Sequence, residues 1–395
     1  MSATASLSDA SLLNVMGEAV HPAHARIPDD IVNCADYERH AAHHMEAMAW
    51  RHLQGGSDQG LALLRNRAAF DRMCLVPQSL ADLRGGHTRT HLLGKTLAHP
   101  IMLAPVAYHR LAHPDGELAT VRASMALQSG FVASTLSSYT LEQIAAAAQE
   151  TVQEMGWGAP LWFQLYSQHE RAHTLALLRR AEKAGYDAVV WTVDAAVKRS
   201  SFALPPGVKP VNLCEFPEMR HTARVGQSGI VLGTPLADMA PTWEELRWLR
   251  AQTRLPLLVK GILSASQARE ALGCGVDGLI VSNHGGRVQD CAPSPMEMLP
   301  AIRSMVDQIK PGTPVLLDSG VRWGTDIAKA LALGAQAVLV GRPQIYALAV
   351  GGISGVAHLL HLLRTELEVV MAQLGCSRVE QLVPDLIWCP SAATP

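Results

Sequence analysis

The sequence predicts an α/β fold, a (β/α)8 barrel of the TIM type, on three observations. Short runs of apolar and β-branched residues recur eight times, and segments of helical period separate most of them. Nearly every run ends in a polar or special residue, as in barrels whose strand ends share one site. No Gly-x-Gly-x-x-Gly pattern follows a strand-like run, as it does in an open dinucleotide-binding sheet; the one at 273–278 comes before such a run. The runs are 101–106, 131–136, 161–166, 188–194, 256–261, 278–283, 314–319 and 337–342.

Helix signals fall between these runs. Thr140 precedes a helical segment with Gln143 at its third position, and Ser264 stands in the same relation to Gln267. Gly273 and Gly334 are placed to close helices. The predicted helices are 117–128, 141–149, 170–184, 243–252, 265–272, 296–309, 325–333 and 356–374.

The 395 residues divide into one barrel with additions. We expect an N-terminal helical extension over 1–99 that packs on the barrel, the barrel itself over 100–378 and a C-terminal tail over 379–395. The connection 195–241, after the fourth strand, contains six prolines and no long helical period. A loop of this length is uncommon unless it covers a site. We interpret it as a lid over the carboxyl ends of the strands; a mobile surface insertion is the alternative.

Composition limits the function classes. The chain is 48% hydrophobic and 17% charged, with a formal charge of −2, so it can bury a large core and offers no basic face for nucleic acid. Seven scattered cysteines without a C-x-x-C pair favour a reducing cytoplasm, and the N-terminus lacks the pattern of a secretory signal. The uncharged stretch 345–363 is nearly long enough to cross a bilayer, but its histidines and glycines favour a buried barrel helix over membrane insertion.

The segment 282–290 carries the strongest chemical signal. His284 and Arg287 follow the apolar run 278–281, which indicates a strand that delivers a proton acceptor and a carboxylate-binding guanidinium to one pocket. The last two strands end in Asp318 to Asp326 and in Gly341-Arg342-Pro343. Their glycines, arginines and helix start are typical of a barrel phosphate site.

These motifs resemble the FMN-dependent 2-hydroxy acid oxidase and dehydrogenase family, which includes glycolate oxidase, lactate oxidase and mandelate dehydrogenase. The resemblance covers about residues 32–378 and implies FMN as cofactor. It also implies oxidation of an L-2-hydroxy acid to the 2-oxo acid, with O2 or another acceptor, in a homo-oligomer that is a tetramer by analogy. The motifs are 104–107, 112–117, 163–166, 192–194, 259–261, 282–287 and 318–326.

The same resemblance assigns roles to residues of this chain. His284 would be the base, Asp194 would orient it, Tyr166 would bind the substrate hydroxyl and Arg287 the carboxylate. Lys260 would stabilise the reduced flavin, and Asp318 would hold the ribityl hydroxyls. The implied cofactor-binding residues are Pro105, Val106, Ala107, Ser137, Gln164, Thr192, Lys260, Ser282, Asp318, Gly320, Arg322, Gly341 and Arg342.

The chain departs from the family pattern at the substrate. His52 stands where the family has a tyrosine, and Arg199 is the candidate for a second carboxylate-binding arginine. Tyr139, beside the expected substrate side chain, suggests a bulky or aromatic substrate. His40 and His44 lie four residues apart, but no other ligand completes a metal site, so we expect no metal. The competing hypotheses are an FMN-dependent isomerase and an FMN-binding barrel with impaired catalysis.

Overall fold

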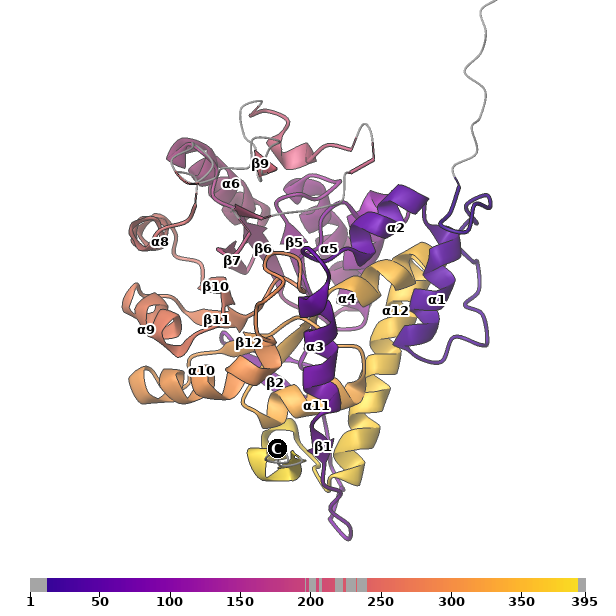
Figure 1. The fold of residues 1–395 in the computed structure, drawn as a ribbon, viewed down its shortest axis with the longest axis vertical. Coiled ribbons are helices and arrows are strands. Elements are labelled where there is room, and N and C mark those ends of the chain that lie inside the picture. Colours follow the sequence, from indigo (N-terminus) through magenta and orange to yellow (C-terminus); the bar gives the residue numbers. More distant parts are fainter. Residues whose placement is uncertain are drawn as a thin grey trace, which may run out of the picture.

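The computed structural model describes residues 13–195, 197–198, 204–205, 208–216, 223–224, 232 and 240–389. Within these residues eight parallel strands close into a barrel, which confirms the predicted fold (Figure 1). The strands follow one another around the barrel in chain order. They are β4 (Ile101–Leu103), β5 (Gly130–Ser134), β6 (Leu161–Leu165), β7 (Ala188–Thr192), β10 (Leu257–Ile262), β11 (Gly278–Val281), β12 (Val315–Leu317) and β13 (Ala337–Val340).

Helices cover the outside of the barrel, close to the predicted ranges. The side chains of Thr140 and Ser264 cap their helices as expected, by accepting from the backbone N–H groups of Gln143 and Gln267. The last predicted helix begins earlier than residue 356, because two segments join across a kink at Gly351 and Gly352. The helices are α4 (Gly116–Ala126), α5 (Leu141–Met155), α6 (Arg171–Ala184), α8 (Trp243–Gln252), α9 (Ala265–Gly273), α10 (Pro295–Ile309), α11 (Gly324–Ala332) and α12 (Arg342–Gln373).

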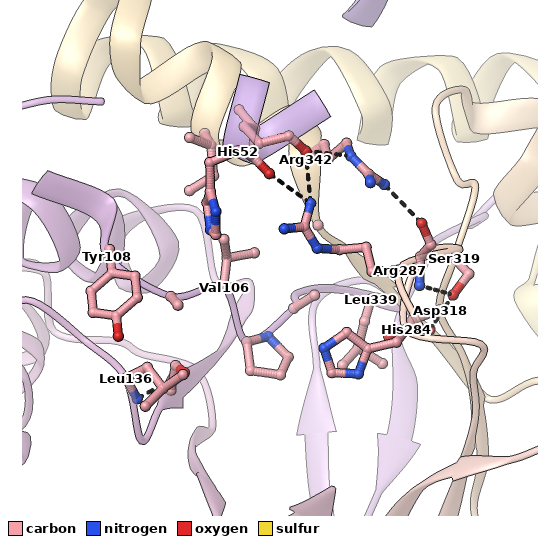
Figure 2. Close-up of a pocket in the computed structure, with 18 of the residues that line it drawn as sticks. His52, Val106, Tyr108, Leu136, His284, Arg287, Asp318, Ser319, Leu339 and Arg342 are labelled. Carbon is pink, nitrogen blue, oxygen red and sulfur yellow. Dashed lines mark hydrogen bonds between the residues drawn. The ribbon is translucent and has the colours of Figure 1, made fainter. Parts of the chain in front are cut away.

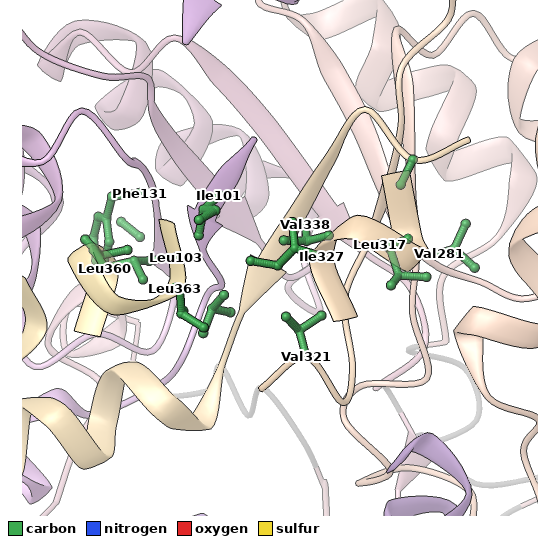
Figure 3. Packing of buried hydrophobic residues seen from close by; sticks show 14 of the residues in the cluster. Ile101, Leu103, Phe131, Val281, Leu317, Val321, Ile327, Val338, Leu360 and Leu363 are labelled. Carbon is green, nitrogen blue, oxygen red and sulfur yellow. The ribbon is translucent and has the colours of Figure 1, made fainter. Parts of the chain in front are cut away.

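Successive side chains of each strand point alternately into and out of the barrel, so the strands build two apolar layers. In β7, Ala188 and Val190 belong to the cluster inside the barrel, whereas Val189 and Trp191 belong to the layer between strands and helices. Figure 3 shows part of the outer layer, where Leu360 and Leu363 of α12 lie near Ile101, Leu103 and Phe131. Both layers are almost completely buried, so the barrel is a packed core and not a pore.

A short hairpin closes the amino-terminal end of the barrel. Its strands β2 (Thr90–Leu92) and β3 (Lys95–Leu97) insert Leu92 and Leu97 into the inner cluster. Thr90 also contacts the carbonyl of Gln336, directly before β13, and Lys95 pairs with Asp187, directly before β7. The inner core is thus sealed at this end, and the carboxyl end remains for a site.

The N-terminal extension packs on the helices around the barrel. Its helix α1 (Cys34–His44) runs beside α12, and α2 (Ala47–Gln54) and α3 (Leu61–Asp71) follow (Figure 1). Asn66 of α3 exchanges two hydrogen bonds with Asn283, at 2.9 and 2.7 Å, which docks the extension against the loop that carries His284.

The two ends of the chain also meet. Strand β1 (Cys74–Leu75) pairs with β14 (Ile387–Trp388), so the described part of the predicted tail is bound to the extension. The exact domain limits at residues 99 and 378 stay a prediction.

The predicted lid is described only in part. Strand β8 (Val197–Lys198) pairs with β9 (Ala223–Arg224), and Leu204 reaches the cavity at the carboxyl ends of the strands. Asn212, in the short helix η2 (Val211–Leu213), donates to the Ser137 hydroxyl and accepts from the Leu141 backbone N–H. These contacts favour a cover over the mouth of the barrel. Lid residues 196, 199–203, 206–207, 217–222, 225–231 and 233–239 lie outside the described part of the chain.

By length and composition α12 could cross a bilayer, with a mean hydropathy of 1.6 over its most apolar window, but 67% of that window is buried inside the protein. The helix packs against α1, α4 and α11. The prediction that this stretch is a buried barrel helix is therefore confirmed.

Close packing of α11 on α12 provides a test of the fold. A Cβ at Gly324 would overlap main-chain atoms of Glu366 and Leu367. We expect Gly324→Ala to lower the free energy of unfolding by about 2 kcal/mol or more, because packed backbone must move apart. In the control Gly273→Ala, the added Cβ meets no atom within 4 Å. Urea denaturation should show it unchanged or more stable by up to about 1 kcal/mol; equal losses in both variants would contradict the packing.

Candidate active site

A cavity of about 380 Å³ opens at the carboxyl ends of the strands (Figure 2). Loops after six strands line it, together with Lys260 of β10, residues of α2 and Leu204 of the lid segment. This location is the one at which barrel enzymes place their chemistry. The polar lining consists of His52, Ser134, Tyr108, Tyr166, Lys260, His284, Arg287, Asp318, Ser319, Arg322 and Arg342.

His284 is fixed by three contacts. Its Nδ1 lies 2.8 Å from Asp194 Oδ1, its Nε2 lies 3.4 Å from the Tyr166 hydroxyl, and its backbone N–H donates to Ser282 Oγ at 3.0 Å. Its backbone is left-handed, with φ of 57°. Because a carboxylate only accepts hydrogen bonds, we assign the proton to Nδ1, which leaves Nε2 as the acceptor. The ring therefore presents a basic nitrogen beside the tyrosine.

Asp194 fits this place because Gly261 leaves room for it. A Cβ on Gly261 would come within 2.7 Å of the Asp194 side chain, and the φ of Gly261 is +111°. Burial by itself raises the pKa of Asp194, but His284 and Lys260 outweigh burial and lower that pKa overall. Asp194 is thus an anion behind the imidazole.

Lys260 and Asp318 form a second buried pair. Lys260 Nζ lies 3.0 Å from Asp318 Oδ2 and donates to Ser282 Oγ at 2.8 Å. Burial acts to lower the pKa of Lys260, but Asp318 and Asp194 raise it overall, so the lysine is a cation. Ser282 accepts from both Lys260 and the His284 backbone, and so connects the two charge pairs.

Two arginines hold the carboxyl end of α2. Arg287 Nη1 donates to the carbonyls of His52, Leu53 and Gly55 at 2.8 to 3.1 Å. Arg342 donates to Leu53 and Gly55 at 2.8 and 3.0 Å, and to the Gly285 carbonyl at 3.1 Å. The helix dipole makes these carbonyls favourable partners for cations.

The cavity lining carries more positive than negative charge: Asp318 pairs with Lys260, but the arginines have no such partner within the described residues. Among the described residues, no carboxylate forms an ion pair with Arg287, Arg322 or Arg342. Burial, followed by the charge of Arg287, lowers the pKa of Arg342 to about 9, as expected for a cation without an anionic partner. The lining is therefore prepared for anionic groups such as a phosphate and a carboxylate.

Two residues predicted to bind the flavin ring have polar atoms that a ligand could satisfy. Gln164 Nε2 and Thr192 Oγ1 are buried and have no hydrogen-bond partner in the described part of the chain. Such atoms are rare in folded proteins unless a ligand or water satisfies them. Nine of the predicted cofactor residues line the cavity: Pro105, Val106, Ala107, Lys260, Asp318, Gly320, Arg322, Gly341 and Arg342.

Two predicted cofactor residues have other partners. The Ser137 hydroxyl donates to the Tyr139 carbonyl at 2.7 Å and accepts from Asn212 at 2.8 Å, so it supports the lid and does not line the cavity. The bond from this hydroxyl to the flavin stays a prediction. Ser282 likewise acts through Lys260 and His284, since its hydroxyl is buried between them.

Of the residues predicted to bind the substrate, some line the cavity and others do not. His52 lines the cavity (Figure 2). Tyr139 does not: its hydroxyl donates to the Pro114 carbonyl at 3.1 Å, and its ring lies 5.7 Å from the Arg110 guanidinium. The chain after β5 directs this side chain toward the loop before α4, and a contact of Tyr139 with the substrate stays a prediction. Arg199 lies outside the described residues.

The sequence analysis missed two residues of this region. Tyr108 lines the cavity directly after the 104–107 motif, in a left-handed conformation with φ of 57°. Glu117 is fully buried, and its Oε1 accepts from the backbone N–H groups of His109 and Ser138 at 3.0 and 2.9 Å. The carboxylate thereby joins the loops after β4 and β5. Its place at the end of the 112–117 motif was the available signal.

The lowered pKa of Asp194 predicts how acid affects stability. A carboxylate whose folded pKa is depressed stabilises the fold above its unfolded pKa, about 3.9, and this contribution is lost as the pH falls through the lower folded value. We expect parent protein to lose more unfolding free energy than Asp194→Asn when urea titrations are moved from pH 5 to pH 3. The exposed Asp385→Asn should follow the parent. Equal acid sensitivity of Asp194→Asn and parent would contradict the anionic assignment.

Comparison with known proteins agrees with this geometry. The FMN-dependent dehydrogenase family matches residues 41–389. An L-lactate oxidase of Alicycliphilus denitrificans is 49% identical, covering 92% of this chain and 98% of its own. A 4-hydroxymandelate oxidase of Amycolatopsis orientalis is 41% identical, covering 88% of this chain and 96% of its own. The crystal structure of a mandelate oxidase superposes with a TM-score of 0.78 at 38% identity, over 91% of this chain and 98% of that one.

These matches extend over nearly the whole barrel and its N-terminal extension, and they confirm the resemblance inferred from the motifs. The orphaned Gln164 and Thr192 atoms and the unbalanced arginines fit the same cofactor. The chain belongs to the FMN-dependent dehydrogenase family, and its cofactor is FMN.

Proposed function

We propose that the protein oxidises an L-2-hydroxy acid to the corresponding 2-oxo acid, with O2 as the final electron acceptor. One observation carries the proposal: His284 Nε2 faces the Tyr166 hydroxyl in a cavity that Arg287 also lines, while Asp194 holds the other side of the imidazole. Oxidation of a 2-hydroxy acid requires a group that accepts a proton, a group that binds the alcohol oxygen and a cation that binds the carboxylate. Relatives named as lactate and 4-hydroxymandelate oxidases support it.

FMN, when bound, takes up the two electrons that leave the substrate. We assign its phosphate to Arg322 and Arg342, whose charges no described carboxylate balances. Gly320 and Gly341 also belong to the cavity lining. The ring is assigned to Gln164 and Thr192, which have unsatisfied polar atoms, and to Lys260.

His284 accepts the substrate proton at Nε2. Asp194, 2.8 Å from Nδ1, stabilises the imidazolium that results and keeps the ring oriented. Burial, followed by the charge of Asp194, raises the pKa of Tyr166. The phenol thus remains neutral and can donate to the substrate oxygen. Arg287 has Nη1 fixed by three carbonyls, which orients its remaining nitrogens for the carboxylate.

The two alternatives from the sequence are less well supported. An FMN-dependent isomerase would have no use for a carboxylate-binding arginine beside a tyrosine and a histidine. A flavin-binding barrel without turnover was motivated by His52 and by the uncertain second arginine. The intact contact between His284 and Asp194 favours turnover.

Location and assembly are further proposals. All seven cysteines are free, which is compatible with the reducing cytoplasm expected from the sequence. The homo-oligomer stays a prediction by analogy with the family.

The proposed reaction is tested by mixing FMN-loaded protein with a panel of L-2-hydroxy acids without oxygen. We expect the yellow flavin to bleach with at least one acid, and hydrogen peroxide to form when air is admitted. Retained flavin that no acid bleaches would instead support the impaired barrel. Bleaching without peroxide in air would exclude O2 as the acceptor.

Removal of the base should separate cofactor binding from chemistry. We expect His284→Ala to retain FMN but to slow flavin reduction by about 10² to 10⁴ in stopped-flow absorbance, the usual range for general-base catalysis. The exposed His361→Ala on α12 serves as the control and should reduce its flavin at the parent rate. A His284→Ala variant that reduces flavin as fast as the parent would exclude the proposed role.

A further inference from the structure

Arg67 of α3 contacts the loop after β12 from outside the cavity. Its Nη1 donates to the Gly320 carbonyl at 2.5 Å and to Asp326 Oδ2 at 2.6 Å, and its Nη2 donates to Asp71 at 3.2 Å. Helix α3 lies beside the start of α11 (Figure 1). Gly320 belongs to the cavity lining, whereas Arg67 does not. The guanidinium therefore holds a loop of the cavity without reaching the cavity itself.

Asp326 extends this contact along the loop. Its side chain is 2% exposed and forms an ion pair with Arg67. The same oxygen, Oδ2, accepts from the backbone N–H groups of Arg322 and Trp323 at 2.8 and 3.1 Å. The backbone of Arg322, from which the side chain assigned to the phosphate extends, is thus fixed by the pair of Arg67 and Asp326.

The start of α11 also gathers negative charge behind this loop. The Gly324 backbone N–H donates to Glu366 at 2.6 Å, so a second carboxylate lies at the same helix end as Asp326. In the described part of the chain, Arg67 is the one cation that pairs with either of these two carboxylates. Loss of Arg67 would leave a buried carboxylate without a cation behind the groups assigned to an anionic phosphate, which is unfavourable for both.

Helix α3 fits closely against Gly320. The φ of Gly320 is +95°, and a Cβ there would lie 3.1 Å from the Asn66 carbonyl oxygen and 3.2 Å from the Phe70 ring. The central carbon of the Arg67 guanidinium lies 5.4 Å from the centroid of the same ring. The position of the guanidinium relative to the loop is therefore set by the packing of α3 and does not depend on a bound molecule.

We propose that Arg67 is a positioning residue for the phosphate of FMN. By bridging the Gly320 carbonyl and Asp326, it holds the loop in the conformation that presents the Arg322 side chain to the phosphate. It also balances the charge of Asp326 behind that loop. This role rests on the assignment of the phosphate to Arg322 and Arg342 in the function proposed above.

The test is an exchange between two flavins that differ by the phosphate. FMN-loaded protein is equilibrated with excess riboflavin, and free and bound flavins are separated by ultrafiltration and quantified. The exchange constant compares two ligands on one protein, so a general loss of stability cancels and a loss of phosphate recognition does not. We expect Arg67→Met to shift this constant toward riboflavin by at least about tenfold, the range expected for losing hydrogen bonds from a charged group.

A matched control lies on the same helix. Arg65 donates to the Asp290 carbonyl at 2.8 Å, in a different loop, so Arg65→Met removes the same charge without changing the contacts of Arg67. It should keep the exchange constant of the parent. Arg67→Lys keeps the charge but presents one ammonium group where the guanidinium bridges two acceptors. We expect a shift between those of the parent and Arg67→Met, and this variant decides the role if Arg67→Met does not fold.

Arg322→Met separates the role of Arg67 from the phosphate assignment. We expect this variant to shift the exchange constant toward riboflavin as well, because it removes a proposed phosphate ligand. An unchanged constant in Arg322→Met would refute the assignment of the phosphate, and the role of Arg67 with it. A shift in Arg322→Met together with a parent-like constant in Arg67→Met would refute the role of Arg67 alone.

Two further outcomes would overturn the role of Arg67. An equal shift in Arg65→Met would make the effect one of net charge on α3, and a parent-like constant in Arg67→Lys would show that the bridge to Gly320 and Asp326 has no part in it. None of these measurements requires turnover. Failure of every hydroxy acid to reduce the flavin would therefore refute the proposed reaction, whereas the flavin exchange would still decide the role of Arg67.

Discussion

The active site depends on the pairing of buried charges at the carboxyl ends of four strands. Asp194 after β7 faces His284 after β11, and Lys260 of β10 faces Asp318 after β12. Ser282 joins the pairs by accepting from the lysine and from the histidine backbone. A charge buried without a partner is strongly unfavourable, so each member fixes the position of the next. The orientation of the imidazole is thus set by the barrel itself.

The N-terminal extension is tied to the same centre through its helix dipole. Arg287 and Arg342 donate to shared carbonyls at the end of α2, namely those of Leu53 and Gly55. One arginine lies toward the proposed substrate carboxylate and the other toward the proposed phosphate. The helix that carries His52 is therefore placed by the cations that are assigned to both ligands, which explains why the extension belongs to the catalytic unit.

The sequence predicted the eight strands and most helices because alternation, helical period and caps such as Thr140 are local signals. It placed the beginning of α12 too late, since Gly351 and Gly352 interrupt the period where two helical segments meet. Strand ends predicted which loops form the cavity. They did not predict where Tyr139 points, because alternation stops at Ser134, where β5 ends. Tyr108 was missed because its left-handed backbone follows from tertiary contacts that no local pattern encodes.

The central claim is that a buried anion behind His284 makes the imidazole an effective base. Anaerobic stopped-flow reduction of the bound flavin in Asp194→Asn, at saturating hydroxy acid, tests it most directly. The account predicts a rate lower by about 10³ or more, as expected when an imidazolium loses its carboxylate, with FMN still bound. Reduction at the parent rate would contradict it, because the pairing of Asp194 with His284 would then be structural only.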